Sequence, residues 1–301
     1  MPRIEVADAK IETGAKHSAD AWGAILDDFD FEVPEIVFSD DVGPFCNGDL
    51  ANVHRGSFNG RAVAVKVARD EGNDDIFNHE AEVLRVLYPE GTPDEKFYRL
   101  LPRLIFTARH DGRPVHVFPW HEGYITFEAI LRAYPSGIDF RDVVWMFKRL
   151  LMAIGFAHEK REIVHGAILP PHVMVHPVEH GAKIVDWSYA VLEVGAKRNR
   201  VRAMSERYRA FYAPEILNRQ SPTAATDIFM AGKCAIALLG GDVRTNDLPA
   251  TVPVEIASFF RSCVEEQPSR RPQNAWDLHV TFDKLLERLV GKPSYRLFVM
   301  P

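Results

Sequence analysis

An Asn-Gly pair at residues 59 and 60 constrains the fold of this chain more than any other feature. It separates two apolar-rich runs within GPFCNGDLANVHRGSFNGRAVAVKVARD, residues 43–70. Asn-Gly supplies the positive φ angles that a two-residue hairpin turn requires. The second run, RAVAVKVA, alternates, so three valines share one face and Lys66 lies between two alanines on the other. The sequence therefore predicts an antiparallel sheet in this part of the chain.

A helix and a second hairpin are expected to complete this part. Residues 74–91, DDIFNHEAEVLRVLYPEG, carry an apolar stripe at helical spacing, formed by Phe77, Val83, Leu84 and Leu87. Residues 101–120, LPRLIFTARHDGRPVHVFPW, are predicted to form two strands that turn at Asp111-Gly112.

The rest of the chain is predicted to be mainly helical. Long apolar or amphipathic segments are FRDVVWMFKRLLMAIGFAHEKREIV (140–164), TDIFMAGKCAIALLGG (226–241), ASFFRSCVEEQ (257–267) and NAWDLHVTFDKLLERLV (274–290). The first is apolar nearly all round, which predicts a buried helix. Two short strands are expected in VMVHP (173–177) and AKIVDW (182–187).

Composition limits the kinds of protein this chain can be. Its 301 residues are 47% apolar and 26% charged, as in globular proteins, and a formal net charge of -6 disfavours a general nucleic-acid or membrane surface. No apolar run approaches the roughly 20 residues of a membrane span, and the first residues lack the apolar core of a signal peptide. The three separated cysteines indicate no disulfide framework or zinc site. We therefore expect a cytoplasmic protein with cysteines that are small buried apolar residues.

The order of elements, together with several motifs, resembles the protein kinase fold. VAVK at Lys66 resembles the kinase VAIK, NHEAEVL carries the helix glutamate at Glu80, and IVDWS at Asp186 resembles the metal-binding DFG segment. The resemblance implies an α+β, bilobal fold with a small antiparallel sheet lobe containing one helix and a larger, mainly α-helical lobe. We expect an N-terminal extension over residues 1–38, the first lobe over 39–120 and the second over 121–301.

The resemblance also implies a nucleotide site. Lys66 would contact phosphates and Glu80 would orient it, with Glu82 as a less favoured partner. The match to the glycine-rich loop is weak, because only Gly48 fits the pattern that ends at Val53. The residues VFPWH fit the hinge that binds adenine. The expected nucleotide-contacting residues are Gly48, Val53, Ala64, Lys66, Glu80, Phe118, Pro119, His121 and Asp186.

Three further positions match structural residues of protein kinases. YAPE ends at Glu215, which in that family pairs with an arginine; Arg271 is the expected partner, and Arg270 is its nearest rival. Asp227, in TDIFMAG, matches the buried aspartate that braces the backbone of the catalytic loop. These matches favour the protein kinase group.

The catalytic loop itself, VHGAILPPHVMV at residues 164–175, departs from the family pattern H-R-D-x-x-x-x-N. Ala167 occupies the position of the aspartate that accepts the substrate proton, and a methyl group cannot do so. His172 occupies the position of the metal-binding asparagine. Imidazole suits softer ions than Mg²⁺, and a hydrogen-bonded loop histidine is the alternative interpretation. We therefore identify no certain catalytic residue.

Several functions are compatible with this pattern. We expect a bacterial-type pseudokinase that regulates a partner through a fold ordered by ATP and Mg²⁺, with Asp186 and His172 as candidate metal ligands. An atypical, weakly active protein serine/threonine kinase is an alternative, because a missing base slows phosphoryl transfer without forbidding it. HGA and IVDW also resemble segments of aminoglycoside-type small-molecule kinases. A fourth possibility is an interaction module that binds no nucleotide.

A basic run lies where protein kinases have their activation segment. Its cations are Lys197, Arg198, Arg200, Arg202, Arg207 and Arg209. They predict either a solvated loop or a surface for an acidic or phosphorylated protein partner. Aromatic residues nearby, Tyr208, Phe211 and Tyr212, would suit single-stranded nucleic acid, but the net charge argues against it. No membrane partner is expected.

Overall fold

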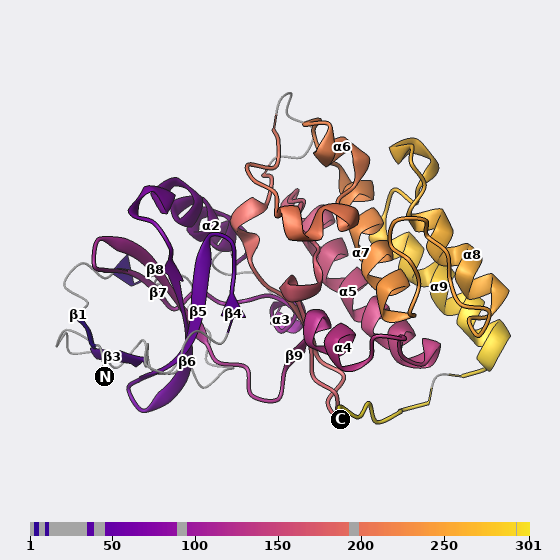
Figure 1. Cartoon of the computed structure of the whole chain (residues 1–301), viewed down its shortest axis with the longest axis horizontal. Coiled ribbons are helices and arrows are strands. Elements are labelled where there is room, and N and C mark those ends of the chain that lie inside the picture. The colour runs from indigo at the N-terminus through magenta and orange to yellow at the C-terminus, as the bar shows by residue number, and fades with distance from the viewer. Residues whose placement is uncertain are drawn as a thin grey trace. The chain divides into compact units, whose positions relative to one another are not determined.

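The computed structural model describes residues 3–5, 10–11, 35–38, 46–88, 95–192, 199–292 and 294–301 (Figure 1). The chain divides into two compact units, one formed by Met1–Tyr98 with Pro102–Glu122 and the other by Arg99–Leu101 with Gly123–Pro301. The sequence placed the corresponding boundary after residue 120. The first unit contains an antiparallel sheet and the second is mainly helical, so the α+β class is confirmed and is compatible with a kinase-like fold.

The first unit is organised around one sheet. Among the described residues it has the order β1-β3-β5-β6-β8-β7-β2, and β4 pairs with β5. The strands are β1 Arg3–Glu5, β2 Lys10–Ile11, β3 Glu35–Phe38, β4 Cys46–Asn47, β5 Ala51–Phe58, β6 Arg61–Ala68, β7 Phe106–His110 and β8 Arg113–Pro119. β1, β2 and β3 lie within the segment 1–38 that was expected to be an extension, and each joins the sheet through antiparallel pairing.

Both predicted hairpins turn where their sequences require. Asn59 and Gly60 have φ angles of 49° and 73°, and Asp111 and Gly112 have φ angles of 49° and 76°. Two successive positive φ angles define the mirror-image turn that matches the twist of paired strands. The turns fix the register of β5 on β6 and of β7 on β8.

The alternation in β6 sends its side chains to two different environments. Val63, Val65 and Val67 join an apolar cluster on one face of the sheet. On the other face Ala68 packs with Phe77 of α2, the helix Asp74–Leu87. Lys66 belongs to this second face, so the strand period brings its ammonium toward the helix. The unit also contains the short helix α3, Glu95–Tyr98, which the sequence did not indicate.

The second unit combines helices with a small sheet of β9 Ile125–Thr126, β10 Val173–Val175 and β11 Ala182–Ile184. Its α-helices are α4 Phe127–Ala133, α5 Phe140–Arg161, α6 Pro214–Leu217, α7 Ala224–Leu238, α8 Val254–Cys263 and α9 Ala275–Val290. Short 3-10 helices occupy η2 Pro170–His172, η3 Trp187–Tyr189, η4 Glu206–Phe211 and η5 Pro268–Arg270. The sequence missed α4, a two-turn helix whose N-cap is Thr126.

Aromatic packing explains why the long helices of this unit associate. Phe147 of α5 contacts Phe260 of α8 edge-to-face at 5.0 Å between ring centroids, and Phe282 of α9 at 5.6 Å. Phe259 stacks on Phe282 at 4.2 Å. Edge-to-face and stacked geometries add to the free energy of burial. The apolar pattern of residues 140–164 was therefore a correct indication of a buried helix, and α5 runs beside α7 and α9 in Figure 1.

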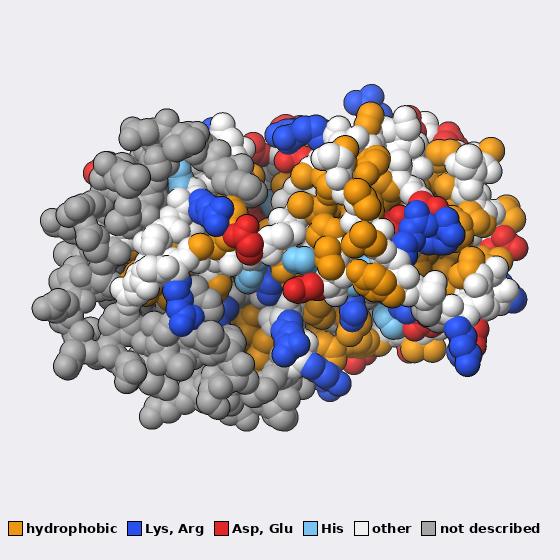
Figure 2. All heavy atoms as spheres, turned by 90° about the horizontal axis from the view of Figure 1, so that it is seen from below, with side chains coloured by type: hydrophobic (Ala, Val, Ile, Leu, Met, Phe, Trp, Pro, Cys, Tyr) orange, Lys and Arg blue, Asp and Glu red, His pale blue; other side chains and the backbone are white. Residues whose placement is uncertain are grey.

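The last described segment, residues 294–301, lies along the second unit. Arg296 forms ion pairs with Asp139 at 3.1 Å and with Asp142 at 3.3 Å, and the Tyr134 hydroxyl donates to the carbonyl of Val299 at 2.6 Å. Phe298 is buried, whereas Tyr295 is exposed. Figure 2, which views the molecule from below, shows apolar side chains gathered over this side of the second unit.

Two further observations bear on the class of protein. Within the described residues, no helix has both the length and the apolar character needed to span a bilayer. Cys234 and Cys263 are buried, and burial raises the pKa of each thiol, so both behave as small apolar residues.

Candidate functional site

A buried trio of charged and polar side chains forms the candidate site of the first unit. The Lys66 ammonium donates to both carboxylate oxygens of Glu80, at 2.9 Å each. His116 of β8 places its Nδ1 2.9 Å from Oε2 of the same carboxylate. All three side chains are buried. The alternative partner, Glu82, is exposed and lies near His79 instead.

Three neighbouring strands and the α2 helix position this trio. Lys66 is directly opposite Val53 of β5 and His116 of β8. The ring of Phe77 lies 4.7 Å from the His116 ring and 5.4 Å from the Lys66 ammonium. His116 was not among the site residues predicted from the sequence. The alternation VHVFP could have indicated it, because Val115 and Val117 face the apolar cluster and His116 must face the other side.

The other predicted nucleotide-contacting residues of this unit lie on the same strands or at their ends. Ala64 is opposite Phe118, and Pro119 ends β8 just before His121. Gly48 joins β4 to β5, and its N–H donates to the carbonyl of Ala51 at 3.0 Å. A Cβ at Gly48 would lie 2.8 Å from that oxygen, so the tight turn requires glycine.

The predicted catalytic loop and metal residues meet in the second unit. His172 Nδ1 lies 2.8 Å from the carbonyl oxygen of Ala167, and His172 Nε2 lies 3.3 Å from Oδ2 of Asp186. A carbonyl only accepts, so Nδ1 must carry a proton. Ala167 is fully buried. At the position where a general base was expected, Ala167 has only a methyl side chain. Its backbone carbonyl already accepts a hydrogen bond from His172.

The backbone around this loop is held in unusual conformations. Asp186 has a φ of 60°, in the left-handed region that non-glycine residues seldom occupy. Gly166 has a φ of 71°, and a Cβ there would lie 2.7 Å from the Val201 side chain. Both the angle and the close approach require glycine at the second position of the loop.

His165 is buried, and both of its ring nitrogens are hydrogen-bonded within the loop region. Its Nδ1 accepts from the Ala167 N–H at 3.2 Å, and its Nε2 donates to the Val185 carbonyl at 3.1 Å. The Trp187 ring covers it edge-on at 4.6 Å. Burial lowers the pKa of His165 from 6.5 to about 4, an effect partly opposed by Asp227.

This burial predicts a pH dependence of stability. Below pH 6.5 the unfolded chain protonates His165, whereas the folded chain keeps it neutral down to about pH 4. The free energy of unfolding should therefore fall as pH drops from 6.5 to 4, by on the order of 3 kcal/mol from this group. Urea unfolding of wild type and His165→Gln across this range measures it. His110→Gln is the control, and equal slopes in wild type and His165→Gln would contradict the prediction.

Asp227, at the start of α7, holds the loop through hydrogen bonds to its backbone. Its Oδ2 accepts from the His165 N–H at 2.8 Å and its Oδ1 from the Gly166 N–H at 2.9 Å. His158 of α5 donates through Nε2 to the same carboxylate at 2.9 Å. Asp227 is completely buried. The carboxylate thus links α5 and α7 to the backbone of the loop.

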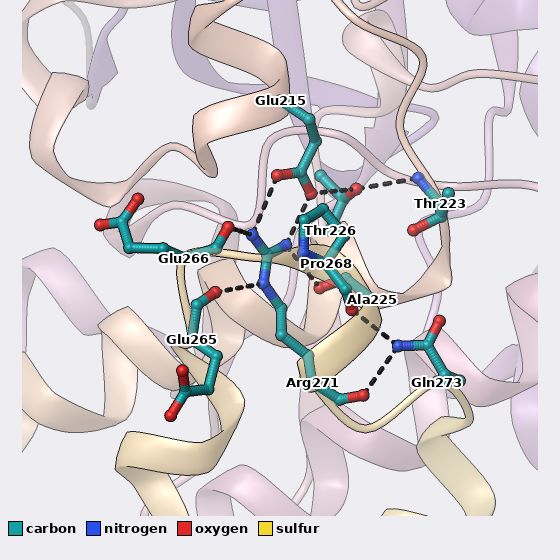
Figure 3. Close-up of polar contacts among 9 residues, drawn as sticks. All are labelled: Glu215, Thr223, Ala225, Thr226, Glu265, Glu266, Pro268, Arg271 and Gln273. Atoms are coloured by element: carbon teal, nitrogen blue, oxygen red, sulfur yellow. Dashed lines mark hydrogen bonds and ion pairs between the residues drawn. The ribbon is translucent and has the colours of Figure 1, made fainter.

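Glu215 and Arg271 form a buried ion pair in the second unit (Figure 3). Arg271 Nη1 lies 2.6 Å from Oε1 of Glu215, and Nη2 lies 3.0 Å from Oε2. The guanidinium also donates to the carbonyls of Glu265 and Glu266, and the Thr226 hydroxyl donates to Glu215. The rival residue, Arg270, is exposed. The pair ties α6 to the segment before α9.

The predicted basic surface is only partly described. Lys197 and Arg198 lie outside the described residues. Arg207 pairs with Glu128 at 2.7 Å, and Arg209 pairs with Glu206 at 3.1 Å. Arg200 and Arg202 are exposed. Part of the positive charge is therefore balanced within the chain.

Comparison with known proteins gives a weak similarity to protein kinases. No protein-family profile matches the chain. It is similar to the serine/threonine-protein kinase PknK of Mycobacterium bovis and of Mycobacterium tuberculosis, with 24% identity over 247 residues. The similarity covers 72% of this chain and 21% of each relative, so the chain spans about a fifth of their length. Together with the fold, this similarity indicates a protein-kinase-like relationship.

Proposed function

We propose that this chain is a protein-kinase-like module that binds ATP but lacks the general base, and that acts on a partner as a pseudokinase. The buried Lys66–Glu80 pair carries the proposal. A buried ion pair adds little to stability, because desolvation offsets most of the Coulombic gain. Both oxygens of Glu80 accept from the Lys66 ammonium and so orient it, and an oriented ammonium is a good phosphate ligand.

The chemistry of the loop supports nucleotide holding more than phosphoryl transfer. Ala167 has no group that accepts a proton, and neutral His165 is buried with both ring nitrogens already hydrogen-bonded. Phosphoryl transfer depends mostly on positioning and electrostatics, so a slow reaction stays compatible with this loop. The relative PknK is named a serine/threonine-protein kinase, and this similarity favours a second candidate function, weak protein serine/threonine kinase activity.

Asp186 and His172 offer different ligand atoms to a divalent metal. Asp186 offers carboxylate oxygens of the type that Mg²⁺ prefers. His172, at the second metal position, offers a nitrogen that Mg²⁺ binds poorly. When bound, a divalent ion would neutralise phosphate charge, and within the second unit the Asp186 carboxylate would help to hold it.

For the partner, we propose an acidic or phosphorylated protein segment. Arg200 and Arg202 are exposed, as are the guanidinium groups of Arg207, which pairs with the partly buried Glu128, and Arg209, whose exposed pair with Glu206 contributes little. An anionic segment could therefore recruit all four cations.

Calorimetric titration with ATP and ADP, with and without divalent metal, tests the nucleotide proposal. We expect binding by the wild type that is lost in Lys66→Ala and weakened in Asp186→Ala. Lys96→Ala removes an exposed lysine of the same unit and should leave binding unchanged. An absence of wild-type binding up to about 1 mM nucleotide would refute the proposal. If binding occurs, a radiolabelled transfer assay separates a pseudokinase from a slow kinase.

A further inference from the structure

In the first unit, two donors from neighbouring strands meet at one oxygen of Glu80. Oε2 of Glu80 lies 2.9 Å from the Lys66 ammonium and 2.9 Å from Nδ1 of His116, while Oε1 accepts a further hydrogen bond from the ammonium. A carboxylate that is paired with an ammonium is ionised and only accepts, so Nδ1 of His116 carries a proton. The imidazole and the ammonium therefore share one acceptor.

The imidazole is the most restrained member of this trio. The side chains of Lys66 and Glu80 are long and rotate about several bonds, whereas the histidine ring sits on a short arm. His116 lies on β8 directly opposite Lys66 of β6. Its ring contacts Phe77 edge-on at 4.7 Å and Phe118 edge-on at 6.1 Å between ring centroids, and the residue is buried. Its N–H group is thus a fixed point for the carboxylate.

We propose that His116 is a positioning residue, which holds the Glu80 carboxylate by Oε2 and thereby sets where the Lys66 ammonium points. The ammonium follows the carboxylate because it donates to both of the carboxylate oxygens. The matched kinase motifs supply the lysine and the glutamate, and the histidine is an addition of this chain. The effect on Lys66 stands by itself, whereas an effect on phosphate binding rests on the proposed nucleotide site.

The role requires a donor at the place of Nδ1, which distinguishes it from packing. Asparagine has an NH₂ group bonded where the imidazole has Nδ1, so His116→Asn keeps a donor near Oε2. His116→Leu fills the space without a donor, and the carboxylate and the ammonium can then turn together. His116→Gln carries its NH₂ group one bond further along the side chain. The order of these variants therefore separates a hydrogen bond from the filling of space.

Carbon-13 NMR of the full chain labelled at lysine tests the proposal without any ligand. The Lys66 ammonium lies 5.4 Å from the centroid of the Phe77 ring, so the ring current shifts the signals of the adjacent methylene. Those signals, identified by their loss in Lys66→Met, should be alike in the wild type and His116→Asn. In His116→Leu they should move toward the position of exposed lysines.

His54→Leu is the matched control for the loss of a buried histidine. His54 is a buried residue of the same sheet, but it lies opposite Val65 and so on the face away from Lys66. Its replacement should leave the Lys66 signals unchanged. Unchanged signals in His116→Leu would overturn the proposal, as would equal changes in His116→Asn and His116→Leu. If circular dichroism shows that His116→Leu does not fold, His116→Gln takes its place in this comparison.

Calorimetric titration of the same variants with ATP and a divalent metal measures the consequence for the proposed function. The dissociation constant should stay within about threefold of the wild-type value in His116→Asn and His54→Leu, and should rise about tenfold in His116→Leu, the scale of one lost hydrogen bond to a charged group.

The two experiments separate this inference from the proposed function. A wild type that binds no nucleotide, but whose Lys66 signals depend on the donor at residue 116, would refute the proposed function and leave the positioning role standing. Nucleotide binding that is equal in the wild type and His116→Leu, with unchanged Lys66 signals, would do the reverse.

Discussion

Replacing Arg271 with methionine is expected to lower the free energy of unfolding by about 3–5 kcal/mol. The substitution removes the guanidinium that binds both oxygens of Glu215 and leaves a buried carboxylate with the Thr226 hydroxyl as its remaining described partner. It also leaves the carbonyls of Glu265 and Glu266 without their donor. Methionine keeps much of the packing against Phe229, over which the guanidinium lies at 4.5 Å. Urea unfolding followed by circular dichroism measures the loss.

Arg270→Met is the matched control, since it removes an exposed arginine from the adjacent position and should change the free energy of unfolding by less than about 0.5 kcal/mol. The double variant Glu215→Gln with Arg271→Met should recover part of the loss, because an uncharged amide is easier to bury than an unpaired carboxylate. Equal losses of unfolding free energy in Arg270→Met and Arg271→Met would show that the ion pair makes no specific contribution to stability.

Local chemistry made much of the first unit predictable from sequence. The turns at Asn59-Gly60 and Asp111-Gly112 depend on backbone preferences that a dipeptide already contains, and each turn then sets the register of its strands. The strand period alone places Lys66 on the face opposite the valines. Its pairing with Glu80 came from the family resemblance, and the structure contains that contact.

Residues whose role depends on distant parts of the chain were not predictable in the same way. His116 reaches Glu80 only because β8 lies beside β6, which a single strand pattern does not reveal. The sequence predicted Arg207 and Arg209 as contacts for an anionic partner. In the folded chain Glu128 and Glu206 pair with them. The sequence identified His172 as a candidate ligand; its hydrogen bond to Ala167, which decides the tautomer, required the folded loop.

The second large effect is expected for Asp227→Asn, which should destabilise the chain by about 2–4 kcal/mol. The aspartate accepts three hydrogen bonds, from the N–H groups of His165 and Gly166 and from His158 Nε2. An asparagine has one oxygen and one NH₂ group. Whichever way the amide turns, its NH₂ must face at least one of these donors, so at least one buried donor loses its acceptor.

His158 makes this substitution harder to accommodate. Its Nε2 faces the carboxylate, so it carries a proton and can bind only an acceptor there, and among the described residues its buried Nδ1 has no hydrogen-bond partner. Asp277→Asn is the control, because Asp277 also lies in the first turn of a helix but is exposed. Urea unfolding should show a loss only for Asp227→Asn, and amide hydrogen exchange should quicken selectively at His165 and Gly166. If exchange there were unchanged, the loop would be held by its other contacts, such as the bond between His172 and Ala167, and Asp227 would not be its brace.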